Sequence, residues 1–401
     1  MTLKLYADDS LLRSCSATVL SCTESKGSYL VEIDRTVFFP EGGGQLTDRG
    51  TLGTAKVLQV TEKDGHIYHQ CSTPLEPGTQ VEAVLDWDVR MDRMQQHCGE
   101  HLLSFACWKL FQASNVGFHM HEDFVAIDLD KELTEAELLE AEALTNAIIW
   151  ENRPVSITYM DSSEAIQLKD QMRKYNDKLT GLLRIVSIED ADVCTCCGTH
   201  PPFTGMVGLV KIIRHEKHKG GCRVEFLCGK RALLDADRKN AILLRVADSF
   251  STKVENVEDK IAKLNEEIST LKERNKKLAG KILLAQVAEE LSKAPTAANG
   301  ARVLFLPLTD SDAKDAKQLL PKVTEIPNTL SLIFTIQPQR ISYIIATTPG
   351  TPGSCQEYIG IVNSILEGRG GGKPDCAQGG SPYCADWQDK LELIKKQILS
   401  S

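Results

Sequence analysis

Short runs of partly alternating apolar and polar residues occupy the first 89 positions of the chain. Tyr29–Ile33, Lys56–Val60 and Thr79–Asp86 are separated by glycine and proline residues. A period of two is typical of strands with one buried face, and short strands punctuated in this way favour a small barrel. We therefore predict a small N-terminal β-barrel domain over residues 1–89.

The pattern becomes helical near Trp87 and then mixed. Arg90–Leu110 and Leu133–Asn152 are predicted helices, and Thr134 with Glu137 three residues later is a capping-box pair. We predict a third, shorter helix over Ser162–Tyr175. Strands are predicted at Leu183–Ile188, Val207–Ile213 and Cys222–Leu227. This mixture indicates an α+β domain over residues 90–245.

A heptad-like pattern begins at Val254. One apolar position holds Val254, Ile261, Ile268 and Ile282, with Asn275 among them, and the other holds Val257, Leu264, Leu271 and Leu278. More than three heptads predict a long coiled-coil-like helix within a connector over residues 246–295. Two partners remain open: Leu233–Phe250 of the same chain, giving a helical hairpin in a monomer, or a second copy, giving a weak dimer through 254–282.

The last segment, residues 296–401, alternates strands and helices. Apolar runs predict strands at Arg302–Leu306, Leu330–Ile336 and Ile341–Ala346, and helical patterns occur at Ala313–Lys322, Tyr358–Gly368 and Trp387–Leu399. This order is typical of a small α/β domain. The glycine-rich stretch from Glu367 to Gly380 is expected to be a loop.

Composition limits the class of protein. The 401 residues carry a net charge of -9, which excludes a wholly basic nucleic-acid binder but allows a local basic surface. The N-terminus lacks the apolar run of a signal peptide, and no stretch is apolar enough to cross a bilayer. We expect a cytoplasmic protein whose 13 cysteines are reduced thiols, some of them bound to metal.

Two pairs of residues have the spacing of metal ligands. His97 and His101 lie one helical turn apart, and Cys196 and His200 have the same spacing. One thiolate and three imidazoles suit a tetrahedral zinc ion, although two unrelated pairs, or a closed structural site, would have the same spacing. Cys194 and Cys197 are neighbouring thiols that compete with Cys196. Zinc proteases have a glutamate directly after the first histidine, whereas Cys98 follows His97 here. We interpret Glu100 as a helix-surface charge.

Two glycine-rich stretches and one basic run are candidate binding segments. Gly42, Gly43, Gly44 and Gln45 form a loop that lets a ligand approach the backbone, with a flexible turn as the alternative. In the C-terminal stretch, Lys373 and loop amides are placed to hold phosphate. The basic run after the second metal pair suits nucleic-acid phosphates or a solvated loop, and includes Lys211, Arg214 and Lys219.

Together these motifs resemble the alanyl-tRNA editing proteins of the AlaX type, in their long form with a DHH-associated C-terminal domain. The matching segments are Pro40–Gln45, His97 with His101, Cys196–His200, and Gly370–Gly380. The resemblance implies a zinc-dependent editing domain over residues 90–245, and a DHH-associated-like domain over 296–401. It implies one Zn²⁺ per chain, held by His97, His101, Cys196 and His200.

The resemblance further implies hydrolysis of mischarged tRNA(Ala), above all seryl-tRNA, with glycyl-tRNA as a second substrate. Gln96 and Thr199 are candidates for contact with the serine hydroxyl, and the water-activating group is not identified. The tRNA would be contacted by the glycine loop, the basic run and Lys373. Neither DNA nor a membrane is an expected partner. Two alternatives remain: a threonyl-type editing domain, and a non-catalytic zinc-stabilised RNA-binding or co-chaperone protein.

Overall fold

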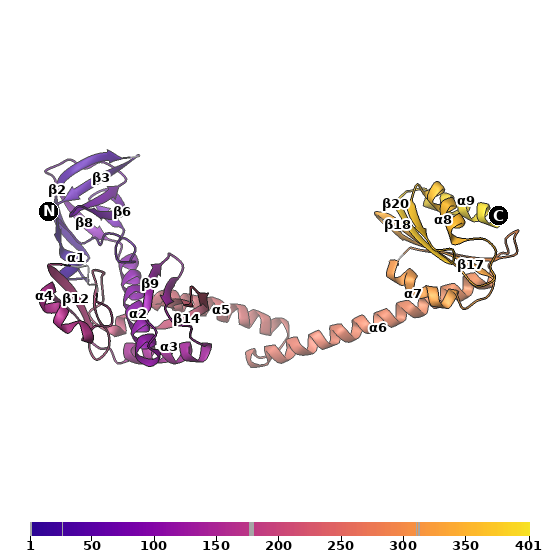
Figure 1. Ribbon diagram of the computed structural model, residues 1–401. Coiled ribbons are helices and arrows are strands. Elements are labelled where there is room, and N and C mark those ends of the chain that lie inside the picture. The colour runs from indigo at the N-terminus through magenta and orange to yellow at the C-terminus, as the bar shows by residue number, and fades with distance from the viewer. Residues whose placement is uncertain (1, 26, 176–179, 310, 312) are drawn as a thin grey trace. The chain divides into compact units, whose positions relative to one another are not determined.

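The computed structural model describes residues 2–25, 27–175, 180–309, 311 and 313–401 (Figure 1). The chain divides into two compact units, Met1–Ser249 and Phe250–Ser401. Both units combine helices with strands, so the predicted α+β class is confirmed. The finer division at residues 89, 245 and 295 stays a prediction.

Six strands of the first unit close into a barrel, in the order β2-β3-β7-β6-β5-β8. Alternation sets its core: Val31 and Ile33 on β3 are buried, whereas Glu32 between them is partly exposed. The strands are β2 (Ser14–Ser25), β3 (Ser28–Ile33), β5 (Gly50–Leu52), β6 (Ala55–Lys63), β7 (His66–Cys71) and β8 (Gln80–Leu85). Before and between them lie α1 (Leu5–Asp8) and the parallel pair β1 (Leu3–Lys4) and β4 (Arg35–Thr36).

The long helix α2 (Trp87–Phe111) follows the barrel, and most of its residues from Arg90 to Cys107 are buried. The Asp86 side chain caps it by accepting a hydrogen bond from Val89 N. Near its start, the fully buried Arg90 side chain binds the Asp48 carboxylate and the Ser10 carbonyl oxygen. This contact ties the start of α2 to the loop that contains the first glycine run.

Helices α2 and α3 (Glu135–Trp150) share an apolar core with an antiparallel sheet of strand order β14-β15-β10-β9. Thr134 and Glu137 form the predicted capping box at the start of α3. The strands are β9 (Asn115–Met120), β10 (Val125–Leu129), β14 (Val210–His218) and β15 (Gly221–Cys228). Strand β14 begins later than predicted because η2 (Thr204–Val207) and Gly208, with φ 84°, come first. Helix α5 (Gly229–Ser249) ends the unit.

A three-stranded sheet carries the second metal pair, and it comprises β11 (Val155–Asp161), β12 (Leu182–Ile188) and β13 (Val193–Thr195). The prediction of one helix over Ser162–Tyr175 is wrong. The segment forms a short helix, α4 (Ser162–Ala165), and a 3-10 turn, η1 (Ile166–Gln171). Arg173 N then donates to Val193 O at 2.9 Å. Pairing with β13 therefore ends the helix and brings Arg173 toward the strand before Cys196.

The second unit is a five-stranded sheet of order β16-β17-β18-β20-β19 with helices on both faces. Successive residues of β16 serve opposite faces: Val303 and Phe305 pack in the cluster with α8 and α9, and Leu304 and Leu306 in the cluster with α6 and α7. The strands are β16 (Arg302–Leu308), β17 (Thr329–Gln337), β18 (Arg340–Thr347), β19 (Arg369–Gly372) and β20 (Cys376–Pro382). The helices are α6 (Val257–Ser292), α7 (Ala313–Val323), α8 (Cys355–Leu366) and α9 (Trp387–Leu399).

The loop expected between Glu367 and Gly380 is instead the antiparallel pair β19 and β20. Glycine permits this pairing because a Cβ on Gly379 would overlap the ring of Tyr343, and a Cβ on Gly370 would overlap the backbone of β20. The glycines therefore allow close strand packing.

Helix α6, which the 3-10 turn η3 (Val254–Asn256) precedes, is the long helix predicted from the heptads. It passes through Gly280 and ends at Ser292. Only its last turns contribute to the core of the second unit, through Leu283 and Val287, while Leu264 and Leu271 are exposed. Its pairing with Leu233–Phe250 or with a second copy stays a prediction. None of the helices within the described ranges is both long and apolar enough to span a membrane.

Candidate metal centre

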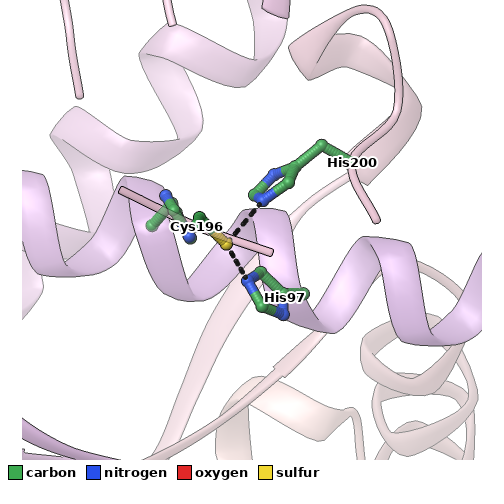
Figure 2. Close-up of side chains that lie close together, drawn as sticks. His97, Cys196 and His200 are labelled. Carbon is green, nitrogen blue, oxygen red and sulfur yellow. Dashed lines mark hydrogen bonds between the residues drawn. The ribbon is translucent and has the colours of Figure 1, made fainter. Parts of the chain in front are cut away.

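The four predicted ligands come together in the first unit. His97 and His101 lie one turn apart on α2, and Cys196 and His200 lie on the loop after β13. One ligand atom from each of the four lies within 4.8 Å of all the others. The Cys196 Sγ atom is 3.1 Å from His97 Nε2 and 3.4 Å from His200 Nε2, and Figure 2 shows this sulfur between the two rings.

The electrostatics prepare these side chains to bind a cation. Burial opposes ionisation of the Cys196 thiol, yet His97 and His101 together hold its pKa well below its usual range. Burial and the nearby His101 lower the pKa of His200 to about 3, so its imidazole is neutral. The thiolate form of Cys196 and the neutral form of His200 are protonation states that a metal ion requires. The donor set and its burial therefore fit a metal ion.

His101 is oriented by a carboxylate that sequence analysis missed. Its Nδ1–H donates to Asp192 Oδ2 at 2.9 Å, which leaves Nε2 for the cluster. Arg173 Nε and Nη2 bond the two oxygens of this Asp192, at 2.7 and 2.9 Å. Arg173 and His101 hold the pKa of Asp192 well below its usual range, although its burial acts in the opposite direction. A carboxylate behind a histidine ligand fixes its tautomer and raises its basicity.

The glycine loop holds the segment that carries Cys196 and His200. Gln45 is fully buried, donates from Nε2 to Thr199 Oγ1 at 2.8 Å, and accepts from Thr199 N at 3.0 Å. Gly198 passes so close that a Cβ there would overlap the His97 ring. On the other side, Arg184 Nη1 donates to the carbonyl oxygens of Cys196 and Gly198. The ligand segment is therefore fixed by bonds to both its side chains and its backbone.

A cavity of about 500 Å³ opens at this cluster. Its walls include Gly43, Phe118, Arg184 and Cys197, together with His97, His101 and Cys196. The interpretation of Glu100 as a helix-surface charge is wrong. This residue is 6% exposed and also lines the cavity, because its face of α2 is covered by the surrounding protein. The site is thus a cavity with a cluster of metal-ligand donors in its wall.

Comparison with known proteins identifies the family. The chain is 32% identical over 405 residues to the alanyl-tRNA editing protein AlaX-L of Pyrococcus horikoshii, covering 94% of each chain. It is 31% identical over 389 residues to the alanyl-tRNA editing protein Aarsd1 of Rattus norvegicus, covering 92% of each. The chain belongs to the alanyl-tRNA editing protein family.

Two further similarities agree with membership of this editing family. Residues 183–225 match the family described as the threonyl and alanyl tRNA synthetase second additional domain. The chain is also 29% identical over 417 residues to an alanine–tRNA ligase of Thermococcus kodakarensis, covering 99% of this chain and 44% of the ligase.

The structure separates the other residues that family resemblance proposed. Gln96 is buried, and its amide bonds the backbone N and O of Cys228. Gly44, with φ 85°, lies against Phe118, and a Cβ there would overlap that ring. Gly42 forms a bridge with Gln45, and Gly43 lines the cavity. Of these four residues, Gly43 is the one that lines the cavity at the metal cluster.

The basic candidates lie on elements outside the cavity wall. Lys211 and Arg214 are on β14. Lys211 Nζ forms an ion pair with Glu142 of α3 at 2.6 Å, and Arg214 forms one with Glu216 of β14 at 2.8 Å. Lys219 stands in the turn after β14 with φ 46°. Lys373 follows β19 in the second unit.

Proposed function

We propose that this chain is a trans-acting aminoacyl-tRNA deacylase that removes wrong amino acids from tRNA(Ala). Its substrates are chiefly seryl-tRNA(Ala), with glycyl-tRNA(Ala) second. The observation that carries the proposal is the cluster of four donors, three of which line a cavity, in a chain that matches editing proteins over nearly its whole length.

The proposed cofactor is one Zn²⁺ per chain, held by His97, His101, Cys196 and His200. Three imidazole nitrogens and one thiolate sulfur are a donor set typical of tetrahedral zinc sites. When bound, zinc supplies a Lewis acid that polarises or orients the ester.

The chain's own residues would position the substrate. Gly43 offers backbone without a side chain at the cavity wall, so an aminoacyl end can approach closely. Thr199 is buried next to the ligand His200, and among the described residues its Oγ1 accepts a bond from Gln45 and donates none. Its hydroxyl is proposed to donate to the serine hydroxyl. Gln96 remains the other candidate. Lys211, Arg214, Lys219 and Lys373 are proposed to contact the tRNA backbone.

A deacylation assay tests this function. The full chain is incubated with seryl-, glycyl- and alanyl-tRNA(Ala), and with seryl-tRNA(Thr) to separate alanyl from threonyl editing. We expect rapid loss of the seryl ester from tRNA(Ala), with alanyl-tRNA(Ala) retained. A chelator abolishes this loss, and added zinc restores it. Undiminished turnover after complete metal removal contradicts the proposal, and so does equal hydrolysis of the alanyl ester.

A further inference from the structure

Among the described residues, one oxygen of the Glu100 carboxylate in this cavity accepts no hydrogen bond. Glu100 precedes His101 on α2, is 6% exposed, and lines the same cavity as His97 and His101. A buried carboxylate is costly unless hydrogen bonds or opposite charges compensate it. Its partners therefore indicate what the cavity is built to receive.

The two oxygens of Glu100 have different surroundings. Oε1 accepts from Ser104 Oγ and from Asn115 Nδ2, both at 2.7 Å, and Asn115 Nδ2 is also 2.9 Å from Ser104 Oγ. Oε2 accepts no hydrogen bond from the described residues, and His101 Nε2 lies 3.8 Å from it. The carboxylate is thus held by one oxygen, while the other remains open on the side of the metal ligands.

Arg173, Lys174 and Arg184 also line this cavity, and Arg173 is close enough to interact electrostatically with Glu100. The Nε and Nη2 atoms of Arg173, however, bond the two oxygens of Asp192. Across the ranges that the structure describes, the ion pairs give Glu100 no lysine or arginine partner. Glu100 therefore offers a fixed anionic acceptor to a cation that enters the cavity.

We propose that Glu100 Oε2 binds the α-ammonium group of the aminoacyl ester. This inference rests on the proposed function and specifies its substrate class as esters with a free amino group. An α-amino group is largely protonated at pH 7. The α-carbon that carries it is bonded directly to the ester carbonyl carbon. An ammonium held by Glu100 beside His101 therefore directs the carbonyl toward the four donors. Esters whose amino group is acylated, such as peptidyl-tRNA, lose this contact and are spared.

The test measures binding, so that it does not depend on turnover. The ligands are two non-hydrolysable adenosine analogues with the acyl group in amide linkage at the 3′ position, one a seryl group and the other its α-hydroxy counterpart. The full-length, zinc-loaded protein is titrated with each by calorimetry. Because a charge-assisted hydrogen bond is lost with the ammonium, we expect wild type to prefer the seryl analogue by about 10- to 100-fold.

The variant Glu100→Gln keeps an acceptor oxygen for Ser104 and Asn115 and removes only the charge. We expect its preference between the two analogues to fall to within about threefold, with unchanged zinc content. Glu140→Gln, on the exposed face of α3, is the matched control and keeps the wild-type preference.

Three results would overturn the inference. The first is that wild type shows no preference, including no detectable binding of either analogue. The second is that Glu100→Gln keeps the wild-type preference. The third is that Glu100→Gln weakens the binding of both analogues by the same factor, which would assign Glu100 to charge balance at the metal. Failure of the proposed function is distinct, because it appears as absent hydrolysis of seryl-tRNA(Ala) in a protein that still discriminates the two analogues.

Discussion

The glycine run at Gly42–Gly44 and the glycine-rich stretch at Gly368–Gly380 lie in different units and can be compared directly. In the first unit, the run precedes the buried Gln45, which bonds the segment carrying Cys196 and His200. In the second, the glycines form β19 and β20 and pack against the ring of Tyr343. In both places, glycine lets the backbone pack closely against neighbouring side chains. The neighbouring polar side chains decide whether this close packing builds a site or a sheet edge.

The largest expected effect is the loss of the thiolate at the metal cluster. In Cys196→Ser, the site keeps three imidazoles and loses its anionic donor. We expect zinc content to fall from about one per chain to near zero, and seryl-tRNA(Ala) deacylation to fall more than about 100-fold. Metal analysis and the deacylation assay measure this. Cys376→Ser, an exposed cysteine of the glycine-rich hairpin, should retain both properties. Equal losses in the two variants would erase the distinction between the regions.

Acid should destabilise the first unit selectively. His69 is fully buried in the barrel, and burial lowers its pKa to about 4 from the ordinary value of 6.5. The neutral form is favoured in the folded state. The stability that the first unit draws from burying neutral His69 is therefore complete above pH 6.5 and is lost as the pH falls toward 4. The shift corresponds to about 3 kcal/mol. All nine histidines precede residue 219, so the second unit has no such group.

Hydrogen exchange at pH 7 and pH 4, corrected for intrinsic rates, separates the two units. We expect the barrel strands to lose protection at pH 4 more than β16–β18 do. In His69→Gln, which can still bond Thr36 and the Val31 carbonyl, the acid-dependent loss should shrink by about 3 kcal/mol. An unchanged loss in this variant would show that His69 is not its source.

Gly198→Ala tests the close approach at the metal cluster. A Cβ at this position would overlap the His97 ring and press on Gln45 Oε1. The ligand segment must shift, and we expect zinc affinity to weaken by about 10- to 100-fold, as when a partner behind a metal ligand is removed. Competition with a chromogenic chelator measures the affinity. Wild-type affinity would mean that the segment is not fixed as described.

The smallest effect is expected from Gly379→Ala in the second unit. The new Cβ would overlap the buried Tyr343 ring, so we expect a loss of about 1–2 kcal/mol in the stability of this unit. Urea unfolding followed by hydrogen exchange of β18 and β20 measures it. Zinc affinity should stay at the wild-type value. A metal defect in this variant would contradict the separate roles of the two glycine regions.

Local spacing made part of this molecule predictable. The four donors were found because each pair lies four residues apart, and the capping box of α3 because its two residues lie three apart. Asp192 and Arg173 were missed because they meet through pairing of the chain before β12 with β13, which has no sequence period. Glu100 was misjudged because α2 is covered on nearly all sides, which removes the usual contrast between its faces. Tertiary packing decides these three cases.

The most direct test of the central claim is X-ray absorption at the zinc edge of the purified full-length protein. The account predicts one sulfur and three nitrogen neighbours, from Cys196 and the three histidines. In Cys196→Ser the sulfur contribution should disappear, while in Cys376→Ser it should remain. Two sulfur neighbours would bring Cys194 or Cys197 into the set, and no sulfur neighbour would place the metal elsewhere; either result contradicts the account.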